Sequence, residues 1–197
     1  MVKLNKIYTR TGDDGTTGLV DGSRIAKSDP LMAAIGDVDE ANCAIGVARA
    51  ALECVYGATI SASLKQSPAT GAVGGMLSHI QNDLFDLGAD LATPDGIDGA
   101  LRIVPAQVAW LEQRIDQLNS ALAPLTSFVL PAGAPGGPEL HLARAVTRRA
   151  ERSAVAAGAG AQPLAYLNRL SDLLFVAARA VNQEGAGDVL WVPGASR

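Results

Sequence analysis

The chain has few of the residues that most often carry metal or redox chemistry. Its 197 residues include only 2 histidines and 2 cysteines. A di-iron site in a helical bundle needs Glu-x-x-His pairs, and neither His79 nor His141 follows a glutamate at that spacing. A structural zinc site needs four closely spaced Cys or His ligands, which are also missing. The sequence therefore predicts neither centre, and we interpret His141 as a local hydrogen-bonding or packing residue.

The cysteines, Cys43 and Cys54, both fall within one predicted helix. Their separation of 11 residues places them on nearly the same side of that helix, too far apart for a disulfide. We predict two buried, reduced thiols without a chemical role.

Long apolar runs and an excess of basic residues are absent as well. No segment approaches the roughly 18 apolar residues of a membrane-spanning helix, and the N-terminus has no apolar signal core. The net charge is −4, whereas proteins that bind nucleic acid usually carry a basic excess. We expect a globular, cytoplasmic protein whose partners include neither nucleic acid nor a membrane.

One apolar pattern, by contrast, occurs five times along the chain. Apolar residues recur mostly at spacings of 3 and 4, which is typical of helices that bury one face, in 38–55, 77–91, 108–122, 143–157 and 167–181. Asp29 and Pro30 supply an N-cap and a first helical residue. The sequence predicts an all-α fold, a five-helix up-and-down bundle.

This pattern also predicts the domain organisation. We expect one domain over 1–197, made of an N-terminal loop segment (1–28), the bundle (29–185) and a C-terminal tail (186–197). Within the bundle, 58–75 is small, polar and without pattern, and it is predicted to be a flexible connection.

The fourth predicted helix carries a cationic stripe. Arg144, Arg148 and Glu151 are spaced i, i+4, i+7 and share one face, while Ala143 and Val146 lie on the core side. Arginines on a rigid helix suit a polyphosphate or the carboxylates of another bundle. The alternative is a solvated face.

Two further segments are rich in polar groups. The stretch 9–19 combines Gly, Thr and Asp, so its backbone and hydroxyls could cradle phosphates and Asp13 or Asp14 could hold a cation. It lacks the Walker A pattern, and an irregular surface loop is the alternative. In the fifth helix, Asn168 and Ser171 lie one turn apart and could read a ligand, although Asn168 could equally bond to a neighbouring helix.

Taken together, these segments resemble the PduO-type (MMAB-type) ATP:cob(I)alamin adenosyltransferases. The resemblance covers nearly the whole chain except 58–75 and the last dozen residues. It rests on TRTGDDGTTGL at 9–19, KSDP at 27–30, GDVDE at 36–40, IQNDLFDLGADLAT at 80–93, FVLPAG at 128–133, HLARAVTRRAER at 141–152 and YLNRLSDLLFVAAR at 166–179.

The resemblance implies a homotrimer of five-helix bundles with active sites between subunits. It implies a corrinoid adenosyltransferase that moves the 5′-deoxyadenosyl group of ATP, with Mg²⁺, to the cobalt of reduced cobalamin (or cob(I)yrinic acid a,c-diamide) and releases triphosphate. Lys27 would approach the phosphates. The residues that would form the loop over ATP are Thr9, Arg10, Thr11, Gly12, Asp13, Gly15 and Thr17.

On the Arg helix, the resemblance implies that Arg144 and Arg148 support the subunit interface and the triphosphate. Arg149 and Arg152 belong to the same ATP-binding element, and Glu151 would help to hold Mg²⁺ or the nucleotide.

Three further residues carry implied roles. Asn168 would contact the nucleotide, and Asp39 would pair with Arg144 across the subunit interface. Phe128 matches the aromatic residue that displaces the lower axial ligand of the corrinoid.

Two other functions stay open at this point. The first is a trimeric carrier that binds ATP and corrinoid and hands adenosylcobalamin to a client enzyme; for the transferase itself, we expect a client enzyme and a reductase as partners. The second is a helical bundle whose Arg face only joins subunits.

Overall fold

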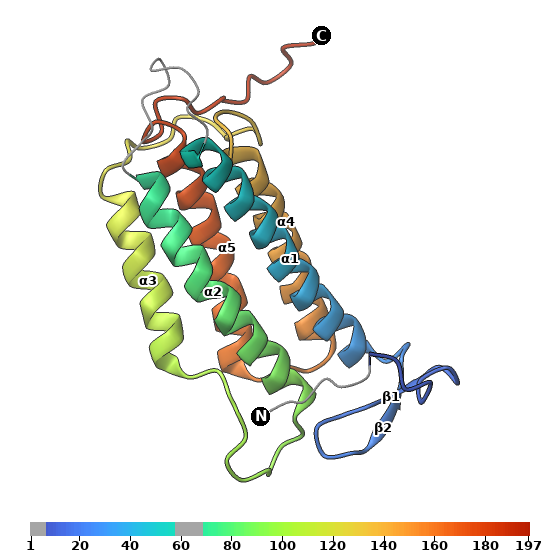
Figure 1. Cartoon of the computed structure of the whole chain (residues 1–197). Helices are drawn as coiled ribbons and strands as arrows, with labels where there is room; N and C mark the ends of the chain where they lie inside the picture. Colours follow the sequence, from blue (N-terminus) through green and yellow to red (C-terminus); the bar gives the residue numbers. More distant parts are fainter. Residues whose placement is uncertain (1–6, 58–68) are drawn as a thin grey trace.

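The computed structural model describes residues 7–57 and 69–197. Five helices account for most of this part of the chain, together with two short strands (Figure 1). The elements are β1 (Thr16–Gly18), β2 (Arg24–Ala26), α1 (Pro30–Gly57), α2 (Ala69–Ala92), α3 (Pro105–Asn119), α4 (Gly137–Ala156) and α5 (Ala161–Val181). The predicted five-helix bundle is confirmed.

Successive helices run up and down, and their apolar faces meet along the bundle (Figure 1). Helix α5 packs against α2, α3 and α4, while α1 packs against α2 and α4. The predicted seams form the core, because burial of one helical face removes apolar surface from water. Seam residues that are almost fully buried include Val38, Ile45, Leu77, Leu84, Leu111, Ala150, Leu170 and Leu174. The side chain of Val55 lies outside the described part.

The helix boundaries confirm some predictions and correct others. The carboxylate of Asp29 accepts a hydrogen bond from Leu31 N at 2.9 Å, as expected of an N-cap. Residues 69–75 are helical, so the predicted connection is too long at this end, and its part at 58–68 lies outside the described residues. This segment consists mainly of alanine and glycine, so the sequence shows no helical period of large apolar residues there.

The two short strands form an antiparallel hairpin that the sequence pattern did not predict. Thr16 pairs with Ala26 and Gly18 with Arg24. The hairpin lies beside the start of α1, at the end of the bundle opposite the α3–α4 connection (Figure 1).

The prediction of two buried thiols is wrong, because Cys43 and Cys54 are both exposed and free. Ala41 belongs to the buried seam of α1, and a position two residues further on points about 200° away from it. The same period that predicts the core therefore places Cys43 on the solvent side.

A buried polar contact ties three helices together. Tyr166 of α5 donates its hydroxyl to Asp83 of α2 at 2.9 Å, and Gln107 of α3 donates to the same carboxylate at 3.0 Å. Burial, followed by the Asp83 charge, raises the pKa of Tyr166, so the hydroxyl stays a donor.

None of the helices in the described part has the length and hydropathy needed to span a bilayer.

Candidate functional site

The cationic stripe lies on the outer face of α4. Arg148, Glu151, Arg152 and Val155 line a hollow of about 250 Å³. Arg152 Nη1 donates to the backbone carbonyl oxygen of Arg148 at 3.1 Å, which holds the Arg152 guanidinium against this side of the helix. The structure thus brings together Arg148 and Glu151, as predicted from their spacing, and adds Arg152 to them. Arg144, the third residue of the predicted stripe, lines a different pocket.

Asn168 joins this stripe from the neighbouring helix α5. Its Nδ2 donates to Glu151 Oε1 at 2.9 Å. Ser171 does not take part, because it is buried and its hydroxyl donates to the Asn168 carbonyl at 2.9 Å. The alternative interpretation of Asn168, a bond to a neighbouring helix, is therefore confirmed, and its contact with a ligand stays a prediction.

Arg149 points away from the stripe, toward α1. Its Nε donates to Asp37 Oδ1 at 3.2 Å, and its Nη2 forms an ion pair with Glu40. The hydrogen bond to Glu40 raises the pKa of Arg149 above its usual value. Ser153 also donates to Asp37, at 2.5 Å, so this side of α4 serves the contact with α1.

Arg144 has a different environment from the other arginines. It lines a pocket of about 480 Å³ with Phe128 and Phe175. Its Nε is buried and has no hydrogen-bond partner among the described residues. Burial, followed by the charge of Arg148, lowers the pKa of Arg144. Asp39, its predicted partner, is exposed and forms no ion pair within residues 7–57 and 69–197.

Phe128 is 77% exposed, at the mouth of this pocket. The segment that carries it pairs with the C-terminal tail: Trp191 N donates to Phe128 O and Leu130 N donates to Val189 O, each at 2.8 Å. The rings of Phe128 and Trp191 meet edge to face, with centroids 5.9 Å apart. The tail therefore supports Phe128, which no sequence pattern indicated.

A buried ion pair anchors this arrangement to the bundle. Arg179 Nε donates to Asp188 Oδ2 at 2.7 Å, with side-chain exposures of only 7% and 4%. Asn182 donates to the other oxygen of Asp188 and accepts a hydrogen bond from Ala134 N at 3.1 Å. A Cβ on Gly133 would lie 2.6 Å from the Asn182 amide, so glycine is required there.

His141 packs against Phe175, one of the residues that line this pocket. It is buried and meets Phe175 edge to face, with ring centroids 6.0 Å apart. Burial lowers the pKa of His141, so the ring is neutral near pH 7. Its packing role agrees with the prediction, although its Nδ1 has no hydrogen-bond partner in the described part of the chain.

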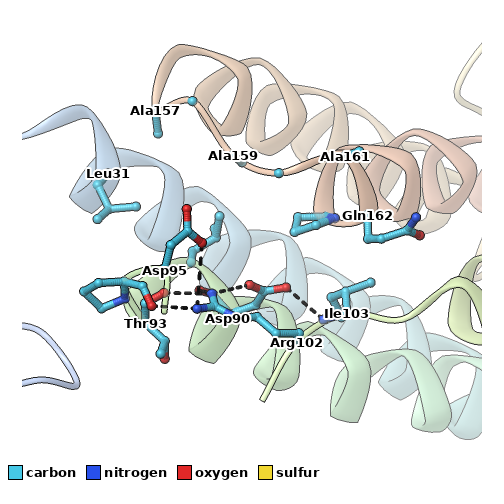
Figure 2. A pocket seen from close by; sticks show the side chains of 15 residues that line it. Leu31, Asp90, Thr93, Asp95, Arg102, Ile103, Ala157, Ala159, Ala161 and Gln162 are labelled. Atoms are coloured by element: carbon cyan, nitrogen blue, oxygen red, sulfur yellow. Dashed lines mark hydrogen bonds and ion pairs between the residues drawn. The ribbon is translucent and has the colours of Figure 1, made fainter. Parts of the chain in front are cut away.

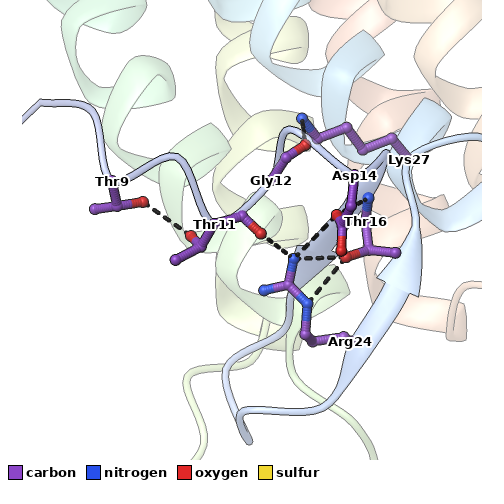
Figure 3. A network of polar contacts seen from close by, with 7 residues as sticks. All are labelled: Thr9, Thr11, Gly12, Asp14, Thr16, Arg24 and Lys27. Carbon is purple, nitrogen blue, oxygen red and sulfur yellow. Dashed lines mark hydrogen bonds and ion pairs between the residues drawn. The ribbon is translucent and has the colours of Figure 1, made fainter.

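The N-terminal segment is organised by Arg24, a residue that no sequence motif indicated (Figure 3). Its guanidinium donates to Thr11 O at 2.5 Å and to Thr16 Oγ1, and it lies 3.7 Å from Asp14. Asp14 accepts from the backbone and hydroxyl of Thr16, which lower the pKa of Asp14. These groups are exposed or half-buried.

The predicted ATP-loop residues surround this network. Lys27 Nζ donates to Gly12 O at 2.8 Å, and Thr9 and Thr11 share a hydroxyl hydrogen bond of 2.8 Å. Arg10 has a left-handed backbone, with φ of 63°. The other members are Asp13, which is exposed, Gly15, with φ of 84°, and the half-buried Thr17.

A separate pocket of about 460 Å³ lies between the α2–α3 connection and the start of α5 (Figure 2). Arg102 dominates it. Its guanidinium donates to Asp90 at 2.8 Å and to the carbonyl oxygens of Asp90, Thr93 and Pro94. Because these partners occupy the guanidinium, we interpret its role as structural: it holds the α2–α3 connection against the end of α2. None of the predicted site residues lines this pocket.

Comparison with known proteins identifies the group to which this architecture belongs. The family model described as cobalamin adenosyltransferase matches residues 7–181. The chain belongs to the cobalamin adenosyltransferase family. It is 49% identical to the corrinoid adenosyltransferase of Mycobacterium tuberculosis, over 100% of this chain and 97% of the relative, and 45% identical to the cobalamin adenosyltransferase of Cupriavidus metallidurans, over 96% and 95%.

Solved structures of the family agree. The fold matches a variant of the PduO-type ATP:corrinoid adenosyltransferase from Lactobacillus reuteri in complex with cobalamin and ATP. The TM-score is 0.81 and the identity 34%, over 95% of this chain and 97% of that one. A second variant of that enzyme, complexed with ATP, matches with a TM-score of 0.79, over 94% of this chain and 100% of that one.

Proposed function

We propose that this protein transfers the 5′-deoxyadenosyl group of ATP to the cobalt of reduced cobalamin and releases triphosphate. The observation that supports it most is the order of groups along α4. Arg144 lies at the Phe128 pocket, and Arg148 and Glu151 line the next hollow. From Arg144 to Glu151 the helix rises about 10 Å. An apolar site for a corrinoid is thus followed along one helix by cationic groups suited to a polyphosphate.

The reaction itself needs no protein nucleophile. Cobalt(I) supplies the electron pair that forms the Co–C5′ bond, and the C5′–O bond breaks with its electrons going to the triphosphate. The protein has to align C5′ with the cobalt and to stabilise the charge on the leaving group. Arg148 and Arg152 perform the second task, because guanidinium groups pair with phosphate oxygens through two parallel hydrogen bonds.

Phe128 acts at the lower face of the corrinoid. An exposed aromatic ring there excludes an axial donor without offering a lone pair of its own. Cobalt(II) without an axial donor accepts an electron more readily, so an apolar neighbour favours the reduced state.

Mg²⁺ fits the acidic group available on α4. Glu151 uses Oε1 to accept from Asn168, and Oε2 has no partner among the residues that the structure describes. Protein sites for Mg²⁺ typically offer one or two carboxylates and leave the remaining positions to phosphates and water. Glu151 would hold the ion, which neutralises phosphate charge, and Asn168 would contact the nucleotide.

The N-terminal segment closes over ATP. Its exposed polar contacts, chiefly those of Arg24 and Lys27, hold Thr9–Thr17 near the start of α1. Lys27 exchanges the Gly12 carbonyl for a phosphate oxygen when ATP is present. The threonine hydroxyls and the Gly12 and Gly15 backbone then line the nucleotide, and Asp13 faces its Mg²⁺.

The active unit is a homotrimer in which each site lies between two subunits. The buried Nε of Arg144 and the exposed Asp39 both lack an ion-pair partner in the described chain. Pairing between Arg144 and the partner subunit's Asp39 satisfies both groups.

A turnover assay tests this function directly. The protein is mixed with chemically reduced cobalamin, ATP and Mg²⁺, and adenosylcobalamin and triphosphate are both quantified. Equal amounts of the two products are expected. Binding of both ligands without either product would instead identify a carrier that delivers adenosylcobalamin to a client enzyme and relies on another enzyme for the chemistry.

A further inference from the structure

Hydrogen bonds behind Asn168 lead away from the α4 stripe and reach α3. Arg169 Nη1 donates to Asn168 Oδ1 at 2.5 Å, and Arg169 Nε donates to Glu112 Oε1 at 3.0 Å. Asn168 Nδ2 donates to Glu151 Oε1 at 2.9 Å. The result is a continuous line of partners, Glu112–Arg169–Asn168–Glu151, that runs from α3 through α5 to α4.

This line determines which way the Asn168 amide faces. A guanidinium group can only donate and an ionised carboxylate can only accept. Between Arg169 and Glu151, the amide therefore has one satisfactory orientation, with Oδ1 toward Arg169 and Nδ2 toward Glu151. The reversed amide would bring donor against donor and acceptor against acceptor. One N–H of Nδ2 and one lone pair of Oδ1 stay free for a ligand.

Arg169 is itself held in place from two sides. Glu112 binds its Nε, and Asp172 Oδ2 lies 3.9 Å from its Nη1. Arg169 follows Asn168 directly, so it projects about 100° away around α5. Neither Arg169 nor Glu112 lines the hollow beside the stripe. Within the described residues, the hydrogen bonds of Arg169 and Glu112 reach the stripe through Asn168.

We propose that Arg169 and Glu112 are positioning residues for the nucleotide. They hold the Asn168 amide, and through it the Glu151 carboxylate, in the orientation in which both meet ATP and its Mg²⁺. This inference rests on the proposed function, because it places the nucleotide against Asn168 and Glu151. It adds a support on α3 and α5 that neither residue type nor sequence spacing indicated.

The test compares three variants of the full chain. ATP binding is measured by calorimetry with Mg²⁺ and without cobalamin, and the KM for ATP and kcat are measured in the turnover assay. Arg169→Met should raise both the Kd and the KM for ATP about tenfold, because the amide loses its charged donor. The KM for cobalamin and kcat should change less than about twofold. Glu112→Gln should raise the KM for ATP about threefold.

The third variant, Arg169→Lys, tests geometry rather than charge. An ammonium group lacks the planar fork that reaches Glu112 and Asn168 together, so the KM for ATP should lie between those of the wild type and Arg169→Met. A KM equal to that of Arg169→Met would show that the fork alone matters and would still support the inference. A KM like that of the wild type would contradict the amide argument.

Arg114→Met is the matched control. Arg114 is a half-buried arginine on α3 that donates to Gln117 at 2.8 Å and lies over the Trp110 ring, with no contact to Asn168. Its ATP binding should equal that of the wild type.

A double-mutant cycle separates positioning from general stabilisation. In an Asn168→Ala background, Arg169→Met should cause no further loss of ATP affinity, because nothing remains to be oriented. Additive losses of ATP affinity in the double variant would overturn the inference. An Arg169→Met protein with an unchanged KM for ATP and a lower melting temperature would overturn it as well. If the wild-type protein binds ATP but makes no adenosylcobalamin, the proposed function is wrong. The calorimetric Kd values of the variants for ATP would then still test this inference.

Discussion

Two segments flank the Arg helix, and they are held in opposite ways. The Phe128 segment, at the start of α4, is anchored by the nearly buried Arg179–Asp188 pair and by Asn182. The 9–27 segment, at the other end of the bundle, depends on exposed hydrogen bonds of Arg24 and Lys27 (Figures 1 and 3). Both belong to the proposed site.

This difference in anchoring agrees with the role proposed for each segment. Exposed hydrogen bonds compete with water and break at little cost, so ATP can replace them as it binds. A ring that has to exclude an axial ligand needs a support that stays unchanged through the reaction. We therefore expect substitutions in one segment to affect ATP binding, and substitutions beneath the other to affect stability.

The largest effect is expected from Arg179→Met. It leaves Asp188 buried and unpaired, which should lower the free energy of unfolding by about 3–5 kcal/mol. Urea denaturation followed by circular dichroism measures it. Arg24→Met is the control and should leave the unfolding midpoint unchanged. Equal losses for the two variants would remove the distinction between the segments.

Phe128→Ala comes next and should act on chemistry alone. Starting from cob(II)alamin and a reductant, the rate should fall about a hundredfold, equal to about 2.7 kcal/mol of barrier. The Kd for ATP and the unfolding midpoint should not change, because the ring is exposed and far from the nucleotide loop. The spectrum of bound cob(II)alamin reports whether the axial ligand returns. An unchanged rate would refute the role of the ring.

Lys27→Ala should raise the KM for ATP about tenfold through loss of a charge-assisted phosphate contact. Asp13→Asn should raise the same constant, through the cation rather than the phosphates. Steady-state kinetics at saturating cobalamin measures both. A change confined to the affinity for cobalamin would contradict the assignment of this segment to ATP.

Arg24→Met should have the smallest effect, a rise of about threefold in the KM for ATP. Arg24 orders the loop without touching the nucleotide, so ATP can restore the order at some cost in affinity. Hydrogen exchange at the Thr16 amide, which donates to Asp14, should be faster in this variant without ATP and should return to the wild-type rate with it. Unchanged exchange without ATP would show that Arg24 does not organise the loop.

Much of the fold is predictable because it depends on one sequence feature, the helical period of the apolar residues. Residues of the Val38–Leu52 seam recur at helical spacing and are buried, and the same arithmetic places Cys43 on the outer side. The hairpin could not be found in this way. Its strands have 3 residues each and alternate no apolar side chains against a core.

Only those parts of the site that lie on one face of a single helix could be predicted from the sequence. The spacing of Arg148 and Glu151 places them together on α4. That Arg149 turns to Asp37 and Glu40 depends on the packing of α4 against α1, which the spacing does not contain. The Arg24 contacts depend on the hairpin register, and the Arg169 contacts depend on the packing of α3 against α5.

The edge-to-face contact between Trp191 and Phe128 gives the protein an optical reporter. The chain has only 2 tryptophans, and the other, Trp110, stacks on His79 with ring centroids 4.2 Å apart. A corrinoid absorbs strongly in the near ultraviolet, so its arrival beside Phe128 should quench the emission of Trp191. Replacing Trp110 with phenylalanine would leave one natural fluorophore, and the filling of the pocket could be followed in real time without any attached dye.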